Sequence, residues 1–260
     1  MTLFAPSGAA LSTRRGVMTL GRGPVLRLVL IACLMPASAL AQEDIIARYQ
    51  VRFGPLRVAD VMFQATETDS AYAAAGRVTS AGLAGAFRDI RFALSSQGWR
   101  DGTGPVPHFY REDVDTGRRV SEVEISYLSG IPSVQRIMPD PPPAAWDLSP
   151  EDQAGTLDPM SALYILARPR PLARLCDWSV AVFDGRRRSV LRLDPAETDG
   201  QDATCEGAYQ RVAGFPPEDM AERRVFPFQA TFTAMANGDW RLTRVETQTL
   251  YGRVRILLLD

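Results

Sequence analysis

The chain has 260 residues with 29 basic and 30 acidic side chains, and every basic side chain is arginine. Because it has no lysine and a single histidine, it cannot form a lysine Schiff base, a P-loop lysine contact or a metal site built from several histidines. The formal charge of −1 argues against a general nucleic-acid binder, which needs a basic face. We attribute the absence of lysine to a GC-rich genome that favours arginine codons. The alternative is a choice of arginine for bidentate recognition of carboxylate or phosphate groups.

The first 41 residues have the order of a secretory signal peptide. They contain no acidic residue, and four arginines precede the apolar run Leu28–Met35, which Pro36 and the small-residue segment Ala39–Ala41 follow. Eight apolar residues are too few to cross a bilayer as a helix, which takes about 20. We expect export to the periplasm, cleavage after Ala41, and no stable transmembrane span in the mature chain.

Two variants of this N-terminus stay open. Thr13-Arg14-Arg15 is similar to a twin-arginine export signal, with Met18 as an alternative start to Met1. Leu30-Ile31-Ala32-Cys33 loosely resembles a lipoprotein cleavage box, so lipidation at Cys33 is the minor alternative to export without an anchor.

Two cysteines remain after cleavage, Cys176 and Cys205. In an oxidising compartment they most simply form one disulfide, which the chain-entropy model values at about 3–4 kcal/mol. A redox role is the alternative, although the spacing is not C-x-x-C. The mature chain carries 25 arginines against 30 acids, a net charge of −5 that is ordinary for a soluble domain.

Residues 42–260 are predicted to form one β-rich domain. Apolar residues alternate with polar or small residues, the pattern of half-buried strands, and Asp184-Gly185 and Asn237-Gly238 are hairpin-turn signals. The expected strands of the first half are Ile45–Phe53, Val61–Phe63, Tyr72–Thr79 (with small residues between its larger ones), Ile90–Leu94 and Arg119–Leu128. Those of the second half are Trp178–Phe183, Arg188–Leu193, Phe226–Ala234, a return strand from Trp240 and a last strand from Tyr251.

The best helix candidate is Asp158–Arg168. Asp158 is a good N-cap, Pro159 occupies the first helical position, and Pro169 ends the segment. Ala81–Phe87 is a short helix or a tight crossing of the chain, and Pro139–Pro143 is a loop. We predict a mainly β fold, an antiparallel meander that forms a curved sheet or a half-open barrel or sandwich with one or two short helices. A further alternative is two sheet halves joined by the proline-rich loop 139–157.

Candidate chemistry is sparse. His108 is the only available imidazole base, no G-x-S-x-G segment accompanies it, and we interpret it as a surface or structural residue. The acidic stretch Asp194–Glu206 lacks the order of a calcium loop, so we expect a solvated loop beside the disulfide. The run Arg186–Arg188 is interpreted as a solvated hairpin edge, with an anionic partner as the minority reading. We predict no catalytic residue, metal or cofactor.

The alternation of aromatic and aliphatic residues has two interpretations. One is an ordinary β core, and the other is a curved sheet whose concave face holds an apolar ligand. The candidate ligand-facing residues are Phe92, Tyr110, Tyr164, Phe228 and Phe232.

Several short motifs follow one another along nearly the whole mature chain. They are Tyr49-Gln50-Val51-Arg52-Phe53-Gly54 with Leu56, Ser96-Gln97-Gly98, Pro107-x-x-Tyr110, Asp158-x-x-Ser161-Ala162-Leu163-Tyr164, Val182-Phe183-Asp184-Gly185 and Cys205-x-Gly207-x-Tyr209-x-Arg211. In this order they resemble the exported bacterial proteins grouped as domain of unknown function 3108. The resemblance implies an envelope protein of mostly antiparallel β architecture with no assigned catalytic residue, and it supplies no function. A likeness to the half-barrel lipoprotein carriers of the periplasm is an analogy of fold alone.

Two functions from different classes follow as hypotheses. The first is a non-catalytic periplasmic binding or carrier module for an apolar molecule such as a lipid or a lipoprotein acyl chain. The second is an interaction or structural protein of envelope assembly that docks a partner through sheet edges or the 158–168 helix. A hydrolase, which needs converging carboxylates, is a distant third.

Overall fold

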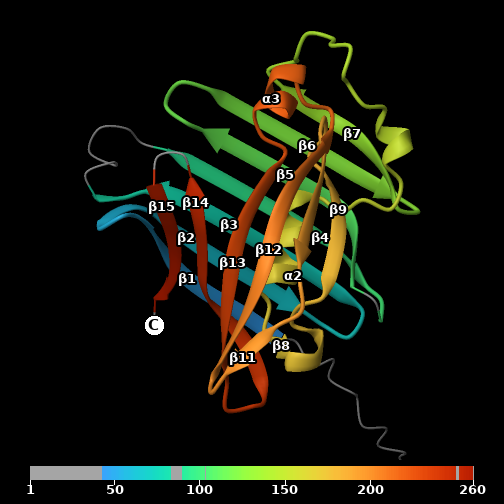
Figure 1. Cartoon of the computed structure of the whole chain (residues 1–260). Coiled ribbons are helices and arrows are strands. Elements are labelled where there is room, and N and C mark those ends of the chain that lie inside the picture. Colours follow the sequence, from blue (N-terminus) through green and yellow to red (C-terminus); the bar gives the residue numbers. More distant parts are fainter. Residues whose placement is uncertain (1–42, 83–89, 103, 250–251, 260) are drawn as a thin grey trace, which may run out of the picture. The chain divides into compact units, whose positions relative to one another are not determined.

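The computed structural model describes residues 43–82, 90–102, 104–249 and 252–259. The predicted signal peptide, residues 1–41, and most of the Ala81–Phe87 segment lie outside these residues. The described part is mainly β with two short α-helices, as predicted from the sequence (Figure 1). No helix of the described part is long and apolar enough to cross a membrane.

All named strands belong to one antiparallel sheet that does not close on itself. The strands of its N-terminal limb are β1 (Glu43–Phe53), β2 (Leu56–Glu67), β3 (Ala71–Ser80), β4 (Arg91–Arg100), β5 (Pro105–Asp115), β6 (Val120–Leu128) and β7 (Ile131–Met138). Those of its C-terminal limb are β9 (Trp178–Phe183), β10 (Arg188–Leu193), β12 (Asp202–Ala213), β13 (Val225–Ala234), β14 (Asp239–Thr249) and β15 (Gly252–Leu259). The short strands β8 (Arg170–Pro171) and β11 (Glu197–Asp199) pair with β14 and β12 at the margin.

The two limbs are joined where the first and last strands meet. The strand order is β7-β6-β5-β4-β3-β2-β1-β15-β14-β13-β12-β10-β9, so each limb is a meander and the β1–β15 ladder connects them. Val51 pairs with Ile256 in this ladder. The segment between β7 and β9 runs back across the open side, because Leu157 pairs with Val182 of β9 and the amide of Gly155 donates to the carbonyl of Gly130 at 2.9 Å.

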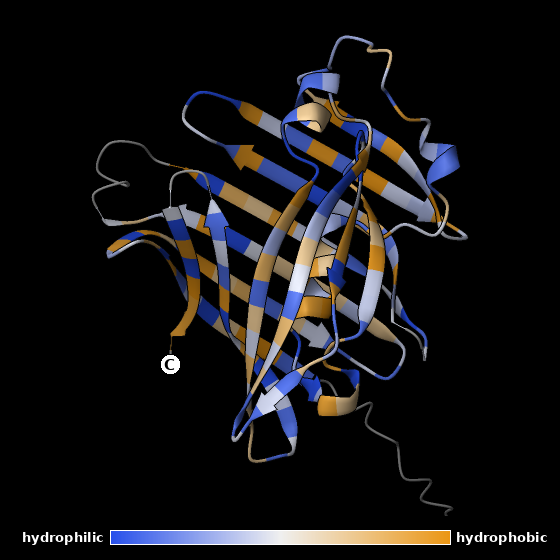
Figure 2. Cartoon of the chain, in the orientation of Figure 1, coloured by the Kyte–Doolittle hydropathy of each residue, from blue (hydrophilic) through white to orange (hydrophobic). Residues whose placement is uncertain are grey.

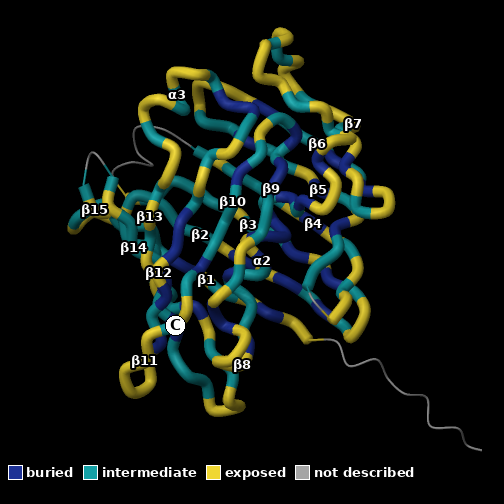
Figure 3. Tube along the Cα trace, turned by 45° about the vertical axis from the view of Figure 1, so that its right-hand side comes forward, coloured by how far each residue is buried: buried dark blue, intermediate teal, exposed yellow. Residues whose placement is uncertain are grey.

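The helix α2 (Pro159–Ala167) lies between the two limbs (Figure 1). It begins as predicted, with Asp158 as N-cap and proline in the first turn, and its side chains Met160 and Tyr164 are fully buried. The buried residues gather around this helix (Figure 3). Along the strands, hydrophobic and hydrophilic residues alternate, because successive side chains point to opposite faces of the sheet (Figure 2).

The predicted Asp184-Gly185 turn joins β9 to β10 and also brings the limbs into contact. Gly185 has φ +100°, and a Cβ there would lie 3.0 Å from Cγ1 of Val123 on β6. A side chain would therefore meet both backbone strain and a steric clash.

The structure differs from the sequence prediction in several segments. We expected a solvated loop over Asp194–Glu206, but this segment contains β11 and the start of β12. The prediction was wrong because the acidic composition hid an alternating pattern, in which Ala203 and Cys205 are buried and Glu206 is exposed. The strands β5 and β7 and the helix α3 (Pro217–Glu222) were not among the predicted elements.

Candidate functional site

The N-terminus of α2 is held to the sheet by a buried polar network. One carboxylate oxygen of Asp158 accepts the backbone N–H of Ser161 at 2.8 Å, and the other accepts the hydroxyl of Ser96 at 2.9 Å. The hydroxyl of Tyr72 lies 2.7 Å from that of Ser161. Burial raises the pKa of Asp158 to about 6, against the lowering effect of the hydrogen bonds from Ser161 and Ser96. Residues from two of the separate sequence motifs thus meet at one helix end.

The network continues along α2 to a charged cluster. The rings of Tyr72 and Tyr164 are stacked with centroids 4.9 Å apart, and the Tyr164 hydroxyl donates to the carboxylate of Glu67. Burial and the bond to Glu67 raise the pKa of Tyr164 to about 12. The same carboxylate pairs with Arg100 and Arg168, each at 3.3 Å. One acidic side chain therefore serves two guanidinium groups.

The five predicted ligand-facing residues are placed in or beside the core. The rings of Tyr110, Tyr164 and Phe232 are fully buried. Phe228 packs against the core on β13, and Phe92 is half-buried on β4 opposite Val78. The space on the concave side is thus filled by α2 and by these side chains. Among the five, Tyr164 also borders an open cleft.

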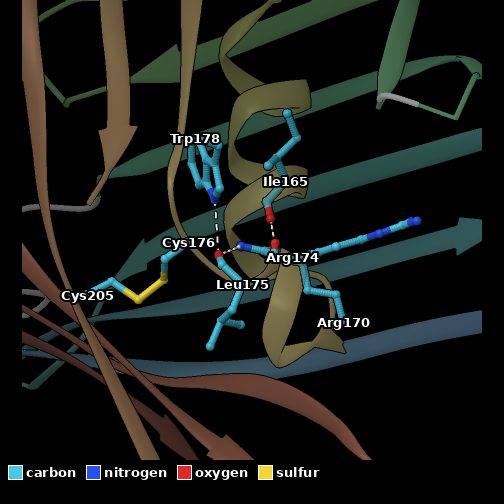
Figure 4. Close-up of a disulfide and its surroundings, with 7 residues drawn as sticks. All are labelled: Ile165, Arg170, Arg174, Leu175, Cys176, Trp178 and Cys205. Carbon is cyan, nitrogen blue, oxygen red and sulfur yellow. Dashed lines mark hydrogen bonds between the residues drawn. A yellow bond between two sulfur atoms is a disulfide. The ribbon is translucent and has the colours of Figure 1, made fainter. Parts of the chain in front are cut away.

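The predicted disulfide between Cys176 and Cys205 is present, and it stands beside a buried arginine (Figure 4). Arg170 is 4% exposed, and its guanidinium donates to the main-chain carbonyl groups of Arg174 and Leu175 at 2.9 and 2.7 Å and to that of Ile165. Burial and the nearby charge of Arg168 lower the pKa of Arg170 to about 9, which leaves it charged at neutral pH.

A cleft opens next to this arginine, which we call the arginine cleft. Its volume is about 620 Å³, and it is bordered by the β4–β5 hairpin, the C-terminal part of α2 and the start of β9. Polar lining is supplied by Arg100, Arg168 and Arg170, and apolar lining by Ile165 and Trp178. Sequence reasoning missed this site, because its charged residues are scattered and none belongs to a motif.

A second feature lies on the face of the N-terminal limb turned away from α2. Four shallow depressions share lining residues and follow β3, with volumes of about 300, 640, 560 and 380 Å³, and the first three also border β4. We call them together the outer trough. Over part of its length the floor consists of small side chains that are adjacent in the strand register, namely Ala73, Ala75, Ala93 and Ser95, and beyond them Arg77, which pairs with Ala93, lines it. From Ala71 to Thr79 the trough extends roughly 25 Å, at the rise per residue of a β-strand.

Large apolar side chains border the outer trough and are exposed to solvent. Ile46 is 70% exposed and Met62 is 41% exposed on the β1–β2 side, and Trp99 is 62% exposed at one end. One feature of the sequence indicated this trough, namely the small residues at alternate positions of the predicted strand Tyr72–Thr79. Which face they occupy was not readable from that pattern.

The remaining sequence candidates lie at the surface. His108 is exposed on β5 at the Trp99 end of the outer trough. Arg186 pairs with Asp147 at 2.9 Å, and the guanidinium of Arg187 lies 5.4 Å from the ring centroid of Phe215. The Arg186–Arg188 run is therefore partly engaged in local contacts. Within the described residues, no three His, Cys, Asp or Glu side chains are grouped closely enough to hold a metal ion.

Comparison with known proteins agrees with the resemblance seen in the sequence. No curated protein matches the chain. Among solved structures, a beta-barrel-like protein of domain of unknown function DUF1849 from Brucella abortus is similar at a TM-score of 0.44 and 10% identity, covering 85% of this chain and 96% of that one. The model of the family described as "Protein of unknown function (DUF3108)" matches residues 48–258. The chain, which this match spans almost from β1 to β15, therefore belongs to that family.

Proposed function

We propose that this chain is an exported envelope protein that binds an extended apolar chain, such as a lipid acyl chain, in the outer trough, and does not transform it. The observation that carries the proposal is the solvent exposure of Ile46, Met62 and Trp99 beside a floor of alanine and serine. Large apolar side chains exposed along one surface depression are typical of an interaction site. The predicted signal peptide supports export.

The shape of the outer trough supports an elongated ligand. Its floor runs parallel to β3 and β4, so a chain lying in it would contact small side chains below and larger ones on both sides. Both polar and apolar atoms line it, with Gln64 and Gln97 among the polar side chains. Apart from the arginine cleft, α2 and the core side chains occupy the concave side of the sheet, so we place the extended apolar ligand on the outer face and not where the sequence hypothesis placed it.

Fluorescence quenching tests this proposal. A brominated fatty alcohol is titrated into the purified full chain, and Trp99 is expected to be quenched because it lies exposed at the end of the trough. Trp99→Phe should remove most of the quenching while leaving the affinity, measured by native mass spectrometry, within about threefold. Quenching that persists unchanged in Trp99→Phe would place the ligand elsewhere.

A matched pair of variants tests the floor of the trough. Ser95 and Ser179 are both exposed serines on strands, but only Ser95 lines the trough. Ser95→Leu should weaken binding of the alcohol at least tenfold, because the added side chain fills the floor, whereas Ser179→Leu should leave it unchanged. Equal binding by both variants, with thermal unfolding showing that both are folded, would contradict the proposal.

One observation supports the alternative hypothesis of a docking protein for envelope assembly, namely exposed apolar side chains at one turn of the sheet. At the β6–β7 turn, Leu128 is 81% exposed and Ile131 is 43% exposed. By contrast, α2 is buried between the limbs and offers a partner little surface. A photo-crosslinking residue at position 128 would test this function in cells: one reproducible protein adduct supports it, and no adduct at any growth stage argues against it.

A further inference from the structure

In the arginine cleft, the negative charges lie at the exposed rim and the positive charges lie deeper. The acidic residues that line it, Asp69, Asp101 and Asp177, are exposed. The guanidinium groups of Arg100 and Arg168 lie deeper, with side chains 22% and 21% exposed. Because water and salt screen exposed charges far more than buried ones, the inner part of the cleft is governed by its arginines.

The inner part carries a surplus of positive charge. Its three guanidinium groups, those of Arg100, Arg168 and Arg170, have one directly paired carboxylate, that of Glu67, and Glu43 is a more distant negative charge acting on Arg168, so positive charge remains in excess. The two pairs with Glu67 measure 3.3 Å each, longer than the 2.7–2.9 Å of a tight charged hydrogen bond. Within the described residues, every hydrogen-bond partner of Arg170 is a main-chain carbonyl group.

The cleft combines this charge with an apolar wall. Ile165, Ala173, Trp178 and Val180 line it together with the arginines, in a volume of about 620 Å³. Guanidinium groups recognise carboxylate and phosphate oxygens through parallel hydrogen bonds. We propose that the arginine cleft binds a small organic oxyanion, a carboxylate or phosphate group on an apolar body, with Arg100 and Arg168 on the oxyanion and Trp178 and Ile165 beside the apolar body.

This site is separate from the outer trough. Trp99 and Arg100 are consecutive on β4, and their side chains point to opposite faces of the sheet, one lining the trough and the other the cleft. The two sites can therefore be tested independently, and the cleft variants should leave binding of the neutral fatty alcohol in the trough unchanged.

Calorimetric titration of the full chain with three probes of equal chain length tests the charge requirement. The probes are hexanoate, hexyl phosphate and hexanol. We expect the two anions to bind at least tenfold more tightly than the alcohol, with affinity falling as salt is added, because the contact is ionic. A stronger response to one anion identifies the preferred head group. An Arg168→Gln substitution that weakens hexanol binding as much as it weakens binding of both anions would overturn the proposal, because hexanol bound in the outer trough does not contact Arg168.

Two substitutions with opposite expected effects test the residues. Glu67→Gln removes the competing carboxylate, so it should tighten hexanoate binding severalfold. Arg168→Gln removes a charged donor and should weaken it at least tenfold, the usual cost of a charge-assisted hydrogen bond. Arg136→Gln, on β7 where Arg136 pairs with Glu122 at 2.8 Å and lines neither site, is the control and should change nothing.

Thermal unfolding shows whether each variant is folded. If Arg168→Gln does not fold, Arg100→Gln removes the second donor from a different element and should weaken binding in the same way. Unchanged or weaker binding by a folded Glu67→Gln protein would overturn the proposal, because a cleft selected by its positive charge must gain from the loss of a negative one.

Discussion

Asp158 shows how a single residue can serve both a helix and the sheet on which the helix packs. It caps α2 through the backbone N–H of Ser161 and accepts the hydroxyl of Ser96 from β4. Its carboxyl group is completely buried, and the pKa is raised to about 6 because burial disfavours the charged form. The residue therefore links the stability of this contact to pH.

We predict that Asp158 makes the folded state less stable as pH rises from about 4 to 6. The folded pKa of about 6 is above the ordinary 3.8, so the folded state binds more protons in this window. The stabilisation from this group is complete below pH 3.8 and is lost as pH rises through 6, a change of about 3 kcal/mol. Urea unfolding at several pH values measures it as the difference between the wild type and Asp158→Asn.

Asp158→Asn should keep the fold, and its free energy of unfolding should lack the pH dependence that Asp158 gives the wild type. Asparagine is a good N-cap, and the hydroxyl groups of Ser96 and Ser161 can rotate to accept from its amide. Asp158→Ala is the contrasting variant, expected to lose about 2–4 kcal/mol at every pH because it removes the cap and leaves buried donors unpaired. Parallel pH profiles for the wild type and Asp158→Asn would exclude this role.

At the scale of elements, Arg170 fixes the chain that leaves α2. Its guanidinium binds carbonyl groups at the end of α2 and in the following turn, and it lies 5.7 Å from the ring centroid of Phe232. Leu175 also accepts a hydrogen bond from the indole N–H of Trp178 (Figure 4). The disulfide at Cys176 then joins this turn to β12.

Arg170→Met should destabilise the protein by about 3 kcal/mol or more, because it leaves several buried carbonyl groups without a donor. Arg170→Lys should recover little of this loss, since a single ammonium group cannot reach carbonyl groups that point from different directions. The exposed neighbour Arg174 provides the control: Arg174→Met should change stability by less than about 0.5 kcal/mol. Thermal or urea unfolding measures all three, and a loss below 1 kcal/mol for Arg170→Met would contradict this role.

At the scale of the whole sheet, the first and last strands form the central ladder. Val51 of β1 pairs with Ile256, which also pairs with Val245 of β14. Each limb is otherwise a meander of neighbouring strands, with local connections. The sheet therefore depends on a pairing between residues about 200 positions apart in the chain, as Val51 and Ile256 are.

A circular permutant tests this arrangement. A flexible linker of about ten residues joins Leu259 to Glu43, and new ends are placed in the exposed loop at Pro142, which turns the β1–β15 ladder into a hairpin. We expect a folded protein whose circular dichroism matches the wild type, because the strand order is preserved. Deletion of residues 252–259 is the contrasting variant and should prevent folding, since it exposes the edges of both β1 and β14. A folded deletion variant would show that the central ladder is dispensable.

The elements of this fold were largely predictable because their signals are local. The alternation in Trp178–Phe183 and Arg188–Leu193 and the turn signal between them predicted that hairpin with its bounds. The N-cap Asp158 and the proline in the first turn likewise predicted where the helix α2 begins. The start of β12 was missed because polar and acidic residues outnumber its buried ones, Ala203 and Cys205.

The sequence by itself determined a mainly antiparallel β fold, the helix Pro159–Ala167 and the disulfide between the two cysteines outside the predicted signal peptide, since each depends on residues near one another or on a count. Only the tertiary structure decided that Ala73 and Ala75 face outward while Tyr72 and Ala74 face the core, because either face of an alternating strand can be buried. It alone brought Glu67 to Arg168, 101 residues further along the chain. Packing of the two limbs around α2 is the physical reason, and no local pattern encodes it.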